Sequence, residues 1–377
     1  MTFAPSDEQR ELTNIVRRFL ADKAGPDTVR REMDTVDGFD RAVWDQMAKE
    51  LGLQALHIPE AYGGMGFSFV ELGLVLEEMG RALLCAPYFS SVVLAANAVL
   101  NAGTEAQRHA LLPGIASGQI RAGLAAAEHG DLWEPASIET RAHAVSGGHR
   151  LYGAKTAVID GHSADVLVVA AREPGTFGED GIGLYVVEPG EAAACTPLPT
   201  LDQTRKLCRI EFDGAPGERL GDHDPGWPAL RRTLRQAAIC LSAEQVGGAQ
   251  ACLDMAVNHA KVRAQFGRPI GGFQAIKHRC ADMLLAVETA RSAARYALAV
   301  AADDAAETEL AMAASLARSH CSEVFSRVAS DTVQVHGGVG FTWEHDAHLY
   351  LKRAKGSEVL LGGVARHREL VAREMGL

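Results

Sequence analysis

Two glycine-rich stretches in the last third of the chain carry most of its information about fold and function. The first is Arg263-Ala-Gln-Phe-Gly-Arg-Pro-Ile-Gly-Gly-Phe-Gln274, and the second is Gln334-Val-His-Gly-Gly-Val-Gly-Phe-Thr-Trp-Glu344. In the first, glycines let backbone N–H groups approach a ligand, and the guanidinium groups of Arg263 and Arg268 can bind a diphosphate in bidentate fashion. An ordinary turn between two helices is the alternative. The second stretch follows a predicted helix and not a strand, which argues against a strand–turn–helix dinucleotide site.

The composition is that of a globular protein with more than one domain. The chain has 377 residues, of which 47% are apolar and 23% are charged, and this length suits two or three domains. Its formal net charge is −11, so we expect neither nucleic acid nor an anionic membrane surface as a partner. No apolar run approaches the roughly 18 residues that a membrane-spanning helix needs.

The seven cysteines are scattered along the chain, without a Cys-x-x-Cys pair. This spacing predicts reduced, mostly buried thiols in a cytoplasmic protein, and it predicts no metal site. The N-terminus has neither the basic nor the apolar segment of a secretory leader. It predicts instead a helix start, in which Ser6 is the N-cap and Gln9 completes a capping box.

Hydrophobic periodicity divides the chain into three regions, which we expect to be domains. Residues 1–120 show the helical spacing of apolar side chains, residues 121–224 show the alternation and turn signals of β-strands, and residues 225–377 return to helices. Strands are predicted over 164–171 and 181–188. Long helices with one apolar face are predicted in the last region, where they would pack as a bundle. They cover 229–262, 272–301, 305–329 and 347–374.

The order of helices, strands and helices, together with both glycine-rich stretches, resembles the acyl-CoA dehydrogenases, which are FAD enzymes that desaturate acyl thioesters. Pro59-Glu-Ala-Tyr-Gly-Gly-Met-Gly66 and Glu77-Glu-Met-Gly-Arg81 also look like this family, and the resemblance covers essentially the whole chain. It implies an N-terminal helical domain, a middle β-barrel domain and a C-terminal four-helix bundle. It further implies FAD as cofactor, an acyl-CoA substrate and an electron-transfer flavoprotein as electron acceptor.

The resemblance also assigns cofactor-binding residues. In the first stretch it implies that four residues bind the diphosphate and adenine side of FAD, namely Arg263, Gln265, Phe266 and Gln274. In the second it implies that three residues contact the adenylate of an FAD bound mainly by a neighbouring subunit, namely Gln334, Gly337 and Gly338. The chain is therefore expected to be at least a dimer, either a homo-oligomer or an assembly with a second acyl-CoA dehydrogenase subunit.

The predicted β domain departs from the family pattern on the side of the flavin ring. Where the family has a Thr-Glu-Pro…Gly-Ser-Asp loop, this chain has Ala125-Ala-Ala-Glu-His-Gly-Asp131, in which only Glu128 and the Gly-Asp pair match. Where the family has Gly-x-Lys-x-Trp-Ile-Thr-Asn-Gly, this chain has Gly153-Ala-Lys-Thr-Ala-Val-Ile-Asp-Gly161. Ala157 and Ile159 replace the Trp and Thr that support the flavin.

The catalytic base of the family is also missing from its two usual places. Dehydrogenation needs a carboxylate within reach of the α-proton of the acyl thioester. The two family positions fall here on Ala237 and Leu361, and neither side chain accepts a proton. Two carboxylates remain near them. Glu244 is the tentative catalytic residue, because an apolar surrounding would raise its pKa. A hydrogen-bonded structural role is the alternative for Glu244, and an ion pair is the alternative for Glu358.

Two functions follow from the resemblance and these departures. The first is FAD-dependent α,β-dehydrogenation of an acyl-CoA thioester by this chain, with Glu244 as a displaced base. The second is a non-catalytic subunit of a heterotetrameric acyl-CoA dehydrogenase, which lends its adenine-side FAD residues to a catalytic partner. A more distant option is a relative with other flavin chemistry, such as nitroalkane or amine oxidation.

Overall fold

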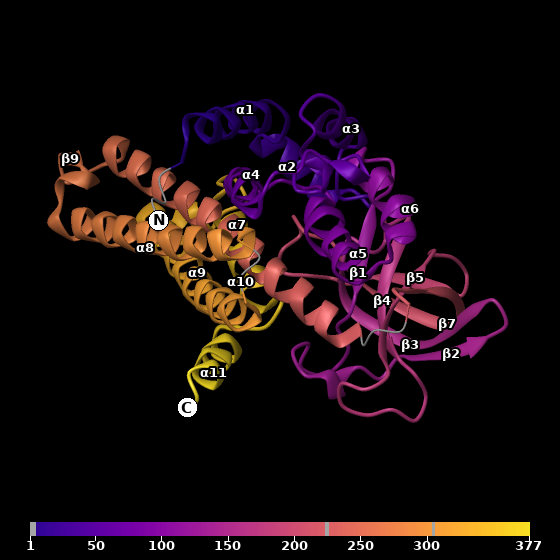
Figure 1. Ribbon diagram of the computed structural model, residues 1–377. Helices are drawn as coiled ribbons and strands as arrows, with labels where there is room; N and C mark the ends of the chain where they lie inside the picture. The colour runs from indigo at the N-terminus through magenta and orange to yellow at the C-terminus, as the bar shows by residue number, and fades with distance from the viewer. Residues whose placement is uncertain (1–4, 223–225, 304–305) are drawn as a thin grey trace. The chain divides into compact units, whose positions relative to one another are not determined.

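The computed structural model describes residues 5–222, 226–303 and 306–377, and it confirms the predicted order of helices, strands and helices (Figure 1). By its internal contacts the chain forms two compact units. One, the β unit, consists of Glu32–Ser68 and Cys85–Ala237. The other, the helical unit, joins the chain up to Arg31 with Phe69–Leu84 and Ala238–Leu377. The expected division into three consecutive domains stays a prediction, because the contacts group the N-terminal helices differently.

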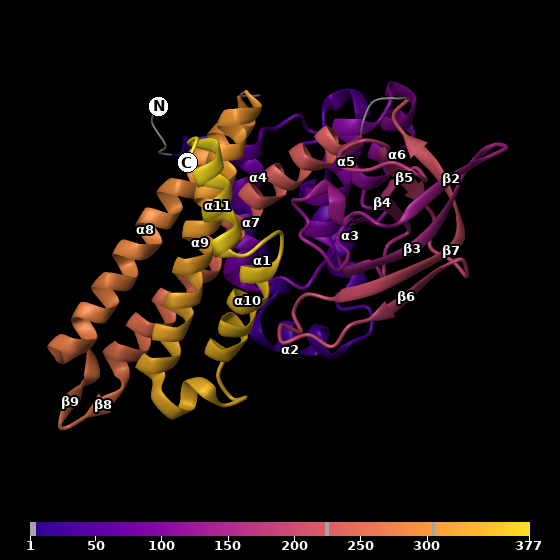
Figure 2. The ribbon, with the colours of Figure 1, turned by 90° about the horizontal axis from the view of Figure 1, so that it is seen from below.

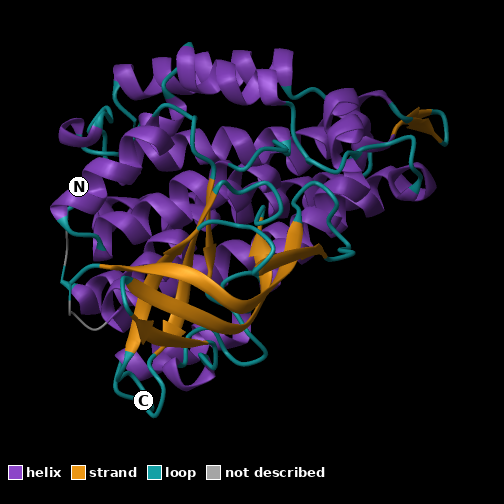
Figure 3. Ribbon diagram, turned by 90° about the vertical axis from the view of Figure 1, so that its right-hand side faces the viewer, coloured by secondary structure: helices purple, strands orange, loops and turns teal. Residues whose placement is uncertain are grey.

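The strands of the β unit close into a ring, as expected for a barrel (Figure 3). Around the ring, β4 pairs with β2, β2 with β3, β3 with β7, β7 with β5, and β5 with β4 again. Strand β1 runs parallel to β4, and β6 runs antiparallel to β7. Closure leaves fewer unpaired strand edges, which is the usual reason for a barrel. The strands are β1 Ala122–Ala125, β2 Arg141–Val145, β3 Gly148–Ile159, β4 Val166–Arg172, β5 Ile182–Val187, β6 Ala193–Pro197 and β7 Leu207–Leu220.

The inward positions of these strands carry the core of the β unit. Leu151, Leu167, Val169 and Ile210 are fully buried there. Burial alternates along much of β7, as on a strand with one solvent-facing side, whereas β4 is buried at nearly every position. Short helical segments complete the unit. They are α3 Arg41–Lys49, two 3₁₀ turns at Leu53–Ala55 and Glu60–Tyr62, a π-helical stretch at Phe89–Ala95, α5 Ala96–Ala102, α6 Glu105–Ala116 and a 3₁₀ turn at Pro135–Ser137. Helix α2, Pro26–Asp34, crosses from one unit to the other.

The helical unit is a bundle of long helices with a small-residue core (Figure 2). The capping box predicted at Ser6 and Gln9 is confirmed at the start of its first helix. The predicted helix over 347–374 is wrong in one respect: it is two helices, because Leu361 and Gly362 adopt positive φ angles of 55° and 91°. The helices are α1 Asp7–Lys23, α4 Phe69–Ala82, α7 Gly226–Val262, α8 Gln274–Ala302, α9 Glu307–His336, α10 Ala347–Val359 and α11 Val364–Glu374.

Two glycines set the crossing of α4 and α7. A Cβ atom on Gly80 would lie 1.9 Å from the carbonyl oxygen of Glu244, and one on Gly247 would lie 1.7 Å from that of Glu77. The backbones of the two helices therefore approach closer than any side chain would allow. Among the described residues, no helix has both the length and the apolar character that a membrane span requires.

Candidate functional site

The first glycine-rich stretch forms a short hairpin at one end of the helical unit. After α7 ends at Val262, β8 Ala264–Gln265 pairs with β9 Arg268–Pro269 through a two-residue turn. The turn residues Phe266 and Gly267 have positive φ angles of 53° and 78°. Positive φ is costly for a phenylalanine, and its ring is 90% exposed. A strained, exposed aromatic tip of this kind indicates a surface that meets a ligand or a partner.

The aromatic rings of the hairpin contact one another, whereas several of its polar side chains remain exposed. The Arg268 guanidinium lies 4.1 Å from the centre of the Phe273 ring, and Phe266 meets the same ring edge-on at 6.1 Å between centroids. By contrast, the side chains of Arg263, Gln265 and Gln274 are exposed and have no polar partner in the part of the chain that the structure describes. They are free to bind something that is not this chain.

The second glycine-rich stretch begins at the end of α9. His336 is the last residue of this helix, and Gly337 follows with φ 65° before a 3₁₀ turn over Gly337–Phe341. A Cβ atom on Gly337 or Gly338 would meet nothing within 4 Å, so the backbone here is open to close approach. Gln334 is exposed, and its amide has no partner among the described residues.

The hairpin of β8 and β9 lies at the same end of the bundle as the segment between α9 and α10 (Figure 2), and three histidines link the two stretches there. The His336 ring lies 4.2 Å from that of His259, one turn before the hairpin, and 4.2 Å from that of His345, which follows the second stretch. Burial, together with the neighbouring His336, lowers the pKa of His259 and of His345, which favours neutral rings. An ion pair of 3.0 Å between Arg279 and Asp331 adds a second link. All seven predicted cofactor-binding residues therefore share one end of the helical unit, which we call the adenine-side end.

The positions where the family keeps its base are apolar and buried. Ala237 is fully buried in α7, and Leu361 is 9% exposed. Glu244, the tentative base, is buried as well, but it is not alone: its Oε1 accepts a hydrogen bond of 2.9 Å from Nη1 of Arg353 in α10, which is also buried. A carboxylate held in this way is a poor acceptor for a substrate proton, because protonation would remove the negative charge that binds the buried guanidinium. The geometry favours the structural role for Glu244.

The turn around Leu361 is fixed by two other buried polar side chains. Arg318 donates to the backbone carbonyls of Ser357 and Leu360, which lie at the C-terminal end of α10. His367 approaches the carbonyl of Leu361 at 2.8 Å through its Nε2, so this nitrogen carries the proton. Burial lowers the pKa of His367 to about 4, and the turn is therefore held by a neutral ring.

Glu358, the second carboxylate near this turn, is ion-paired. It accepts from Nζ of Lys355 at 2.9 Å and from the hydroxyl of Ser326 at 2.8 Å. Burial alone would raise its pKa, but these two partners outweigh burial and lower it. This agrees with the ion-paired alternative for Glu358. We call Glu244, Arg353, Arg318, His367 and the turn that they surround the α10–α11 region.

In the β unit, the loop that follows β1 is also held by hydrogen bonds within the chain. Glu128 accepts hydrogen bonds from Nζ of Lys155 at 2.5 Å and from the backbone N–H groups of Glu139 and Thr140 at 3.0 Å. Lys155 is fully buried, and burial lowers its pKa to about 8. For Glu128, burial alone would raise the pKa, but Lys155 outweighs burial and lowers it. The residue that matched the family loop thus has a structural partner.

Strand β3 carries an irregularity where the family pattern is lost. Its pairing with β7 shifts register between Lys155 and Val158, and Ala157 in this bulge has a φ of 51°. Ile159 is 4% exposed and belongs to the core of the unit. Within the bulge the N–H of Thr156 donates to the carbonyl of Ala127 at 2.9 Å, and neither Ala157 nor Ile159 offers a ring or a hydroxyl.

The chain matches known proteins over its whole length. The models of the acyl-CoA dehydrogenase N-terminal domain and C-terminal domain match residues 6–119 and 224–376. The chain belongs to the acyl-CoA dehydrogenase family. Acyl-CoA dehydrogenase IpdE2 of Mycolicibacterium smegmatis is 34% identical over 357 residues, which is 95% of each chain. The predicted enzyme class, an oxidoreductase acting on a CH–CH bond, is confirmed.

Two solved structures of acyl-CoA dehydrogenases are similar to this chain. A variant of the Tcur3481–Tcur3483 steroid ACAD has 30% identity and a TM-score of 0.88, with 98% of each chain covered. The ChsE4–ChsE5 complex from Mycobacterium tuberculosis has 28% identity and a TM-score of 0.89, with 100% of this chain and 99% of that chain covered. Both names describe an assembly of two different chains.

FAD is the cofactor of the acyl-CoA dehydrogenase family, and the adenine-side end fits it. The observation that tests the fit is a set of polar side chains that have no partner within residues 5–222, 226–303 and 306–377, beside an open backbone at Gly337. These side chains are Arg263, Gln265, Gln274 and Gln334. Arginine and amide donors suit a diphosphate and an adenine ring. The segments that match the flavin-side loop and strand of the family offer fewer polar groups to a cofactor, because Glu128 and Lys155 bind each other.

Several residues that shape this family member were not found from its sequence. Arg353, Arg318 and His367 are buried; the two arginines meet partners on helices far apart in the chain, whereas His367 meets Leu361 six residues before it. The available signal was weak: an arginine on an apolar helix face is unusual in a core unless it is paired. The stack of His259, His336 and His345 had a clearer signal, since the three histidines flank the two glycine-rich stretches.

Proposed function

We propose that this chain takes part in the FAD-dependent α,β-dehydrogenation of an acyl-CoA thioester. Arg263, Gln265, Phe266 and Gln274 would hold the diphosphate and adenine side of FAD. Gln334, Gly337 and Gly338 would contact the adenylate of an FAD bound mainly by a neighbouring subunit. When bound, FAD would supply the hydride acceptor at flavin N5, and an electron-transfer flavoprotein would take the electrons onward.

We further propose that this chain is the subunit of a two-chain acyl-CoA dehydrogenase that lends its adenine-side residues, while a partner chain supplies the catalytic base. One observation carries this proposal: Glu244, seven residues after the apolar Ala237 on α7, is already bound in a buried ion pair with Arg353. The similarity to assemblies named as two different chains supports it. The name of one of them also makes a steroid-derived acyl-CoA the substrate class to test first.

The alternative is dehydrogenation by a homo-oligomer in which Glu244 removes the α-proton. Its support is that Glu244 is a buried carboxylate on the helix that also carries Ala237. For this alternative, Arg353 would have to release Glu244 when substrate binds. Proton transfer would then follow the usual requirement of a base in direct contact with the α-carbon.

The deciding experiment is to purify the chain alone and together with a co-expressed second acyl-CoA dehydrogenase chain, and to measure FAD per chain and acyl-CoA-dependent bleaching. We expect little FAD and no bleaching for the chain alone, and both in the complex. Near one FAD per chain with bleaching in the homo-oligomer would overturn the two-chain proposal.

The variant Glu244→Gln separates the two roles of this residue. In the complex, a structural role predicts unchanged turnover per bound flavin and a lower melting temperature. A role as base predicts a loss of turnover by orders of magnitude with flavin still bound. Asp254→Asn is a matched control, because it changes another carboxylate on the same helix that is paired with an arginine.

A further inference from the structure

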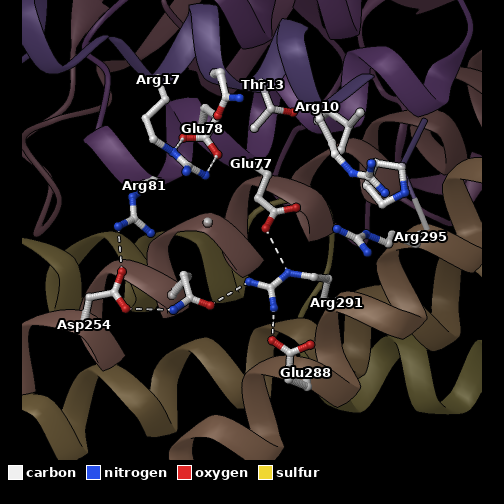
Figure 4. A pocket seen from close by; sticks show the side chains of 15 residues that line it. Arg10, Thr13, Arg17, Glu77, Glu78, Arg81, Asp254, Glu288, Arg291 and Arg295 are labelled. Atoms are coloured by element: carbon white, nitrogen blue, oxygen red, sulfur yellow. Dashed lines mark hydrogen bonds and ion pairs between the residues drawn. The ribbon is translucent and has the colours of Figure 1, made fainter. Parts of the chain in front are cut away.

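A large charged cavity lies within the helical unit, away from the adenine-side end (Figure 4). It has a volume of about 630 Å³ and is lined by α1, α4, α7 and α8. Five arginines and four carboxylates contribute to its described lining. Part of this lining is open to solvent, because the side chains of Arg10, Arg17 and Glu288 are each more than half exposed. A polar group can therefore reach its charged donors and acceptors from solvent.

Two of these arginines keep hydrogen-bond donors that the protein does not use. Arg17 donates through Nε and Nη2 to Glu78 at 2.8 and 2.7 Å, and Arg81 donates through Nη2 to Asp254 at 2.6 Å. Within the described parts of the chain, Nη1 of Arg17 and both Nε and Nη1 of Arg81 have no acceptor. Figure 4 shows both guanidinium groups at the same side of the cavity. Two such groups side by side suit one carboxylate.

The same two arginines border a second hollow of about 300 Å³. This hollow lies between α1, α2, α4 and α10, and Arg17, Glu78 and Arg81 line both spaces. Most of its wall is aliphatic, in contrast to the charged cavity. The aliphatic residues include Leu20, Ala21, Ala24, Val29 and Leu349. The charged cavity and the aliphatic hollow therefore meet at Arg17 and Arg81.

We propose that this place is a binding site for an amphipathic monocarboxylate, such as a medium-chain fatty acid. Its carboxylate would bind between Arg17 and Arg81, and its hydrocarbon chain would lie in the aliphatic hollow. Arg17 and Arg81 are each paired with one carboxylate, and Asp346 in the lining of the hollow is paired with Arg30. The groups that would bind the ligand carboxylate are therefore the unused N–H donors of the two arginines.

The site stands apart from the proposed dehydrogenation. None of its residues is among the predicted FAD-binding residues, and it needs neither FAD nor a partner chain. Its pocket size is in the range that binds small organic ligands. The side chain of Arg17 is 52% exposed and that of Arg81 is 33% exposed, so a ligand can reach both from solvent.

The test is calorimetric titration of the full chain with decanoate below its micelle concentration, and with decanol as the neutral control. We expect saturable binding of decanoate and binding of decanol that is weaker by about tenfold or more, because the charge-assisted hydrogen bonds are lost. Arg81→Gln should weaken decanoate binding by about tenfold or more for the same reason. Arg18→Gln changes an exposed arginine beside Arg17 on α1 and should leave decanoate binding within about twofold.

A second variant fills the hollow without touching a charge. Ala21 lines the hollow but is itself exposed, so Ala21→Phe should fold normally and block the hydrocarbon chain. A melting curve for each variant separates lost binding from lost folding. The absence of saturable decanoate binding, equal binding of decanol, or unchanged binding by Ala21→Phe would each overturn the proposal.

Discussion

The adenine-side end and the α10–α11 region belong to the same bundle, but they differ in the burial and the pairing of their polar side chains. At the adenine-side end, Arg263 and Gln334 are exposed and have no partner in the described chain. In the α10–α11 region, Glu244 and Arg353 are buried and bind each other. Along α7, Glu244 and the end of the helix are separated by about 27 Å.

This contrast separates residues that bind something else from residues that hold the fold. A buried polar group needs a partner to offset its desolvation, and a partner inside the chain makes it structural. An exposed polar group at a strained turn keeps its donors for a ligand. The contrast is what we expect of a chain that binds FAD through Arg263 and Gln334, as proposed, and lacks a carboxylate at Ala237 and Leu361.

The largest effect is expected from Arg353→Met in the α10–α11 region. It leaves Glu244 buried without its arginine, and breaking a buried pair in this way costs about 3–5 kcal/mol of unfolding free energy. Urea denaturation measures the loss. Replacing both partners, in Glu244→Leu with Arg353→Met, should recover most of the stability. Equal stability of the single variant and the unchanged chain would show that the pair is not structural.

The next effect is a dependence on pH through His367, whose ring holds the turn at Leu361. The unfolded chain binds this proton near pH 6.5, whereas burial lowers the folded pKa to about 4. Between these values the unfolded state carries more protons, so stability falls as pH falls from about 6.5 to 4. The full loss is about 3 kcal/mol at pH 4.

Unfolding curves of His367→Gln across this pH range check the effect. The variant should show a shallower loss, but not a flat one, because burial also lowers the pKa of His57 to about 4. A slope identical to that of the unchanged chain would mean that His367 does not titrate with unfolding.

At the adenine-side end, Arg263→Ala should change flavin binding and not stability. The arginine is exposed, so the melting temperature of the apoprotein should hold. Loss of a charge-assisted hydrogen bond should weaken FAD binding by about 1.5–3 kcal/mol, which is roughly tenfold to a hundredfold. Flavin fluorescence in the purified complex measures it. Lys261→Ala removes a neighbouring exposed charge and serves as the control. An equal effect in both variants would show that Arg263 acts on FAD only through its positive charge and not through a specific hydrogen bond.

The smallest effect is expected from Gln334→Ala. A neutral hydrogen bond contributes about 0.5–1.5 kcal/mol, so FAD affinity should fall by a few-fold. If the residue acts on the FAD of a neighbouring chain, the change should weaken flavin binding only in the assembly. Comparison of the chain alone with the complex measures this, and the same loss in both would contradict an action between subunits.

The sequence predicts the elements well where signals are local. The capping box at Ser6 needs only two side chains three residues apart, and the structure contains it. The strands predicted over 164–171 and 181–188 appear as β4 and β5, because alternation and flanking turns lie within each segment. The two glycine-rich stretches also meet at one end of the bundle, as antiparallel helices of similar length require.

Features that depend on residues far apart in the chain are harder to predict from the sequence. The break between α10 and α11 rests partly on Arg318, which reaches the turn from α9, about forty residues earlier in the chain, and partly on His367 of α11 itself. The role of Glu244 depends on Arg353, more than a hundred residues away in the chain. An apolar run around a carboxylate predicts burial, but it does not reveal whether an arginine will be buried beside it.

The close crossing of α4 and α7 has a consequence for the way this protein is made. Gly80 leaves a ribosome long before Glu244, the residue whose backbone it must touch. At common rates of synthesis the delay is roughly ten to thirty seconds. During this time the glycines and leucines of α4 that later pack against α7 stay exposed. Chains with exposed apolar surface of this kind aggregate or bind chaperones. Slower translation between these segments would lengthen the wait, so synonymous codon choice there should affect the yield of folded protein.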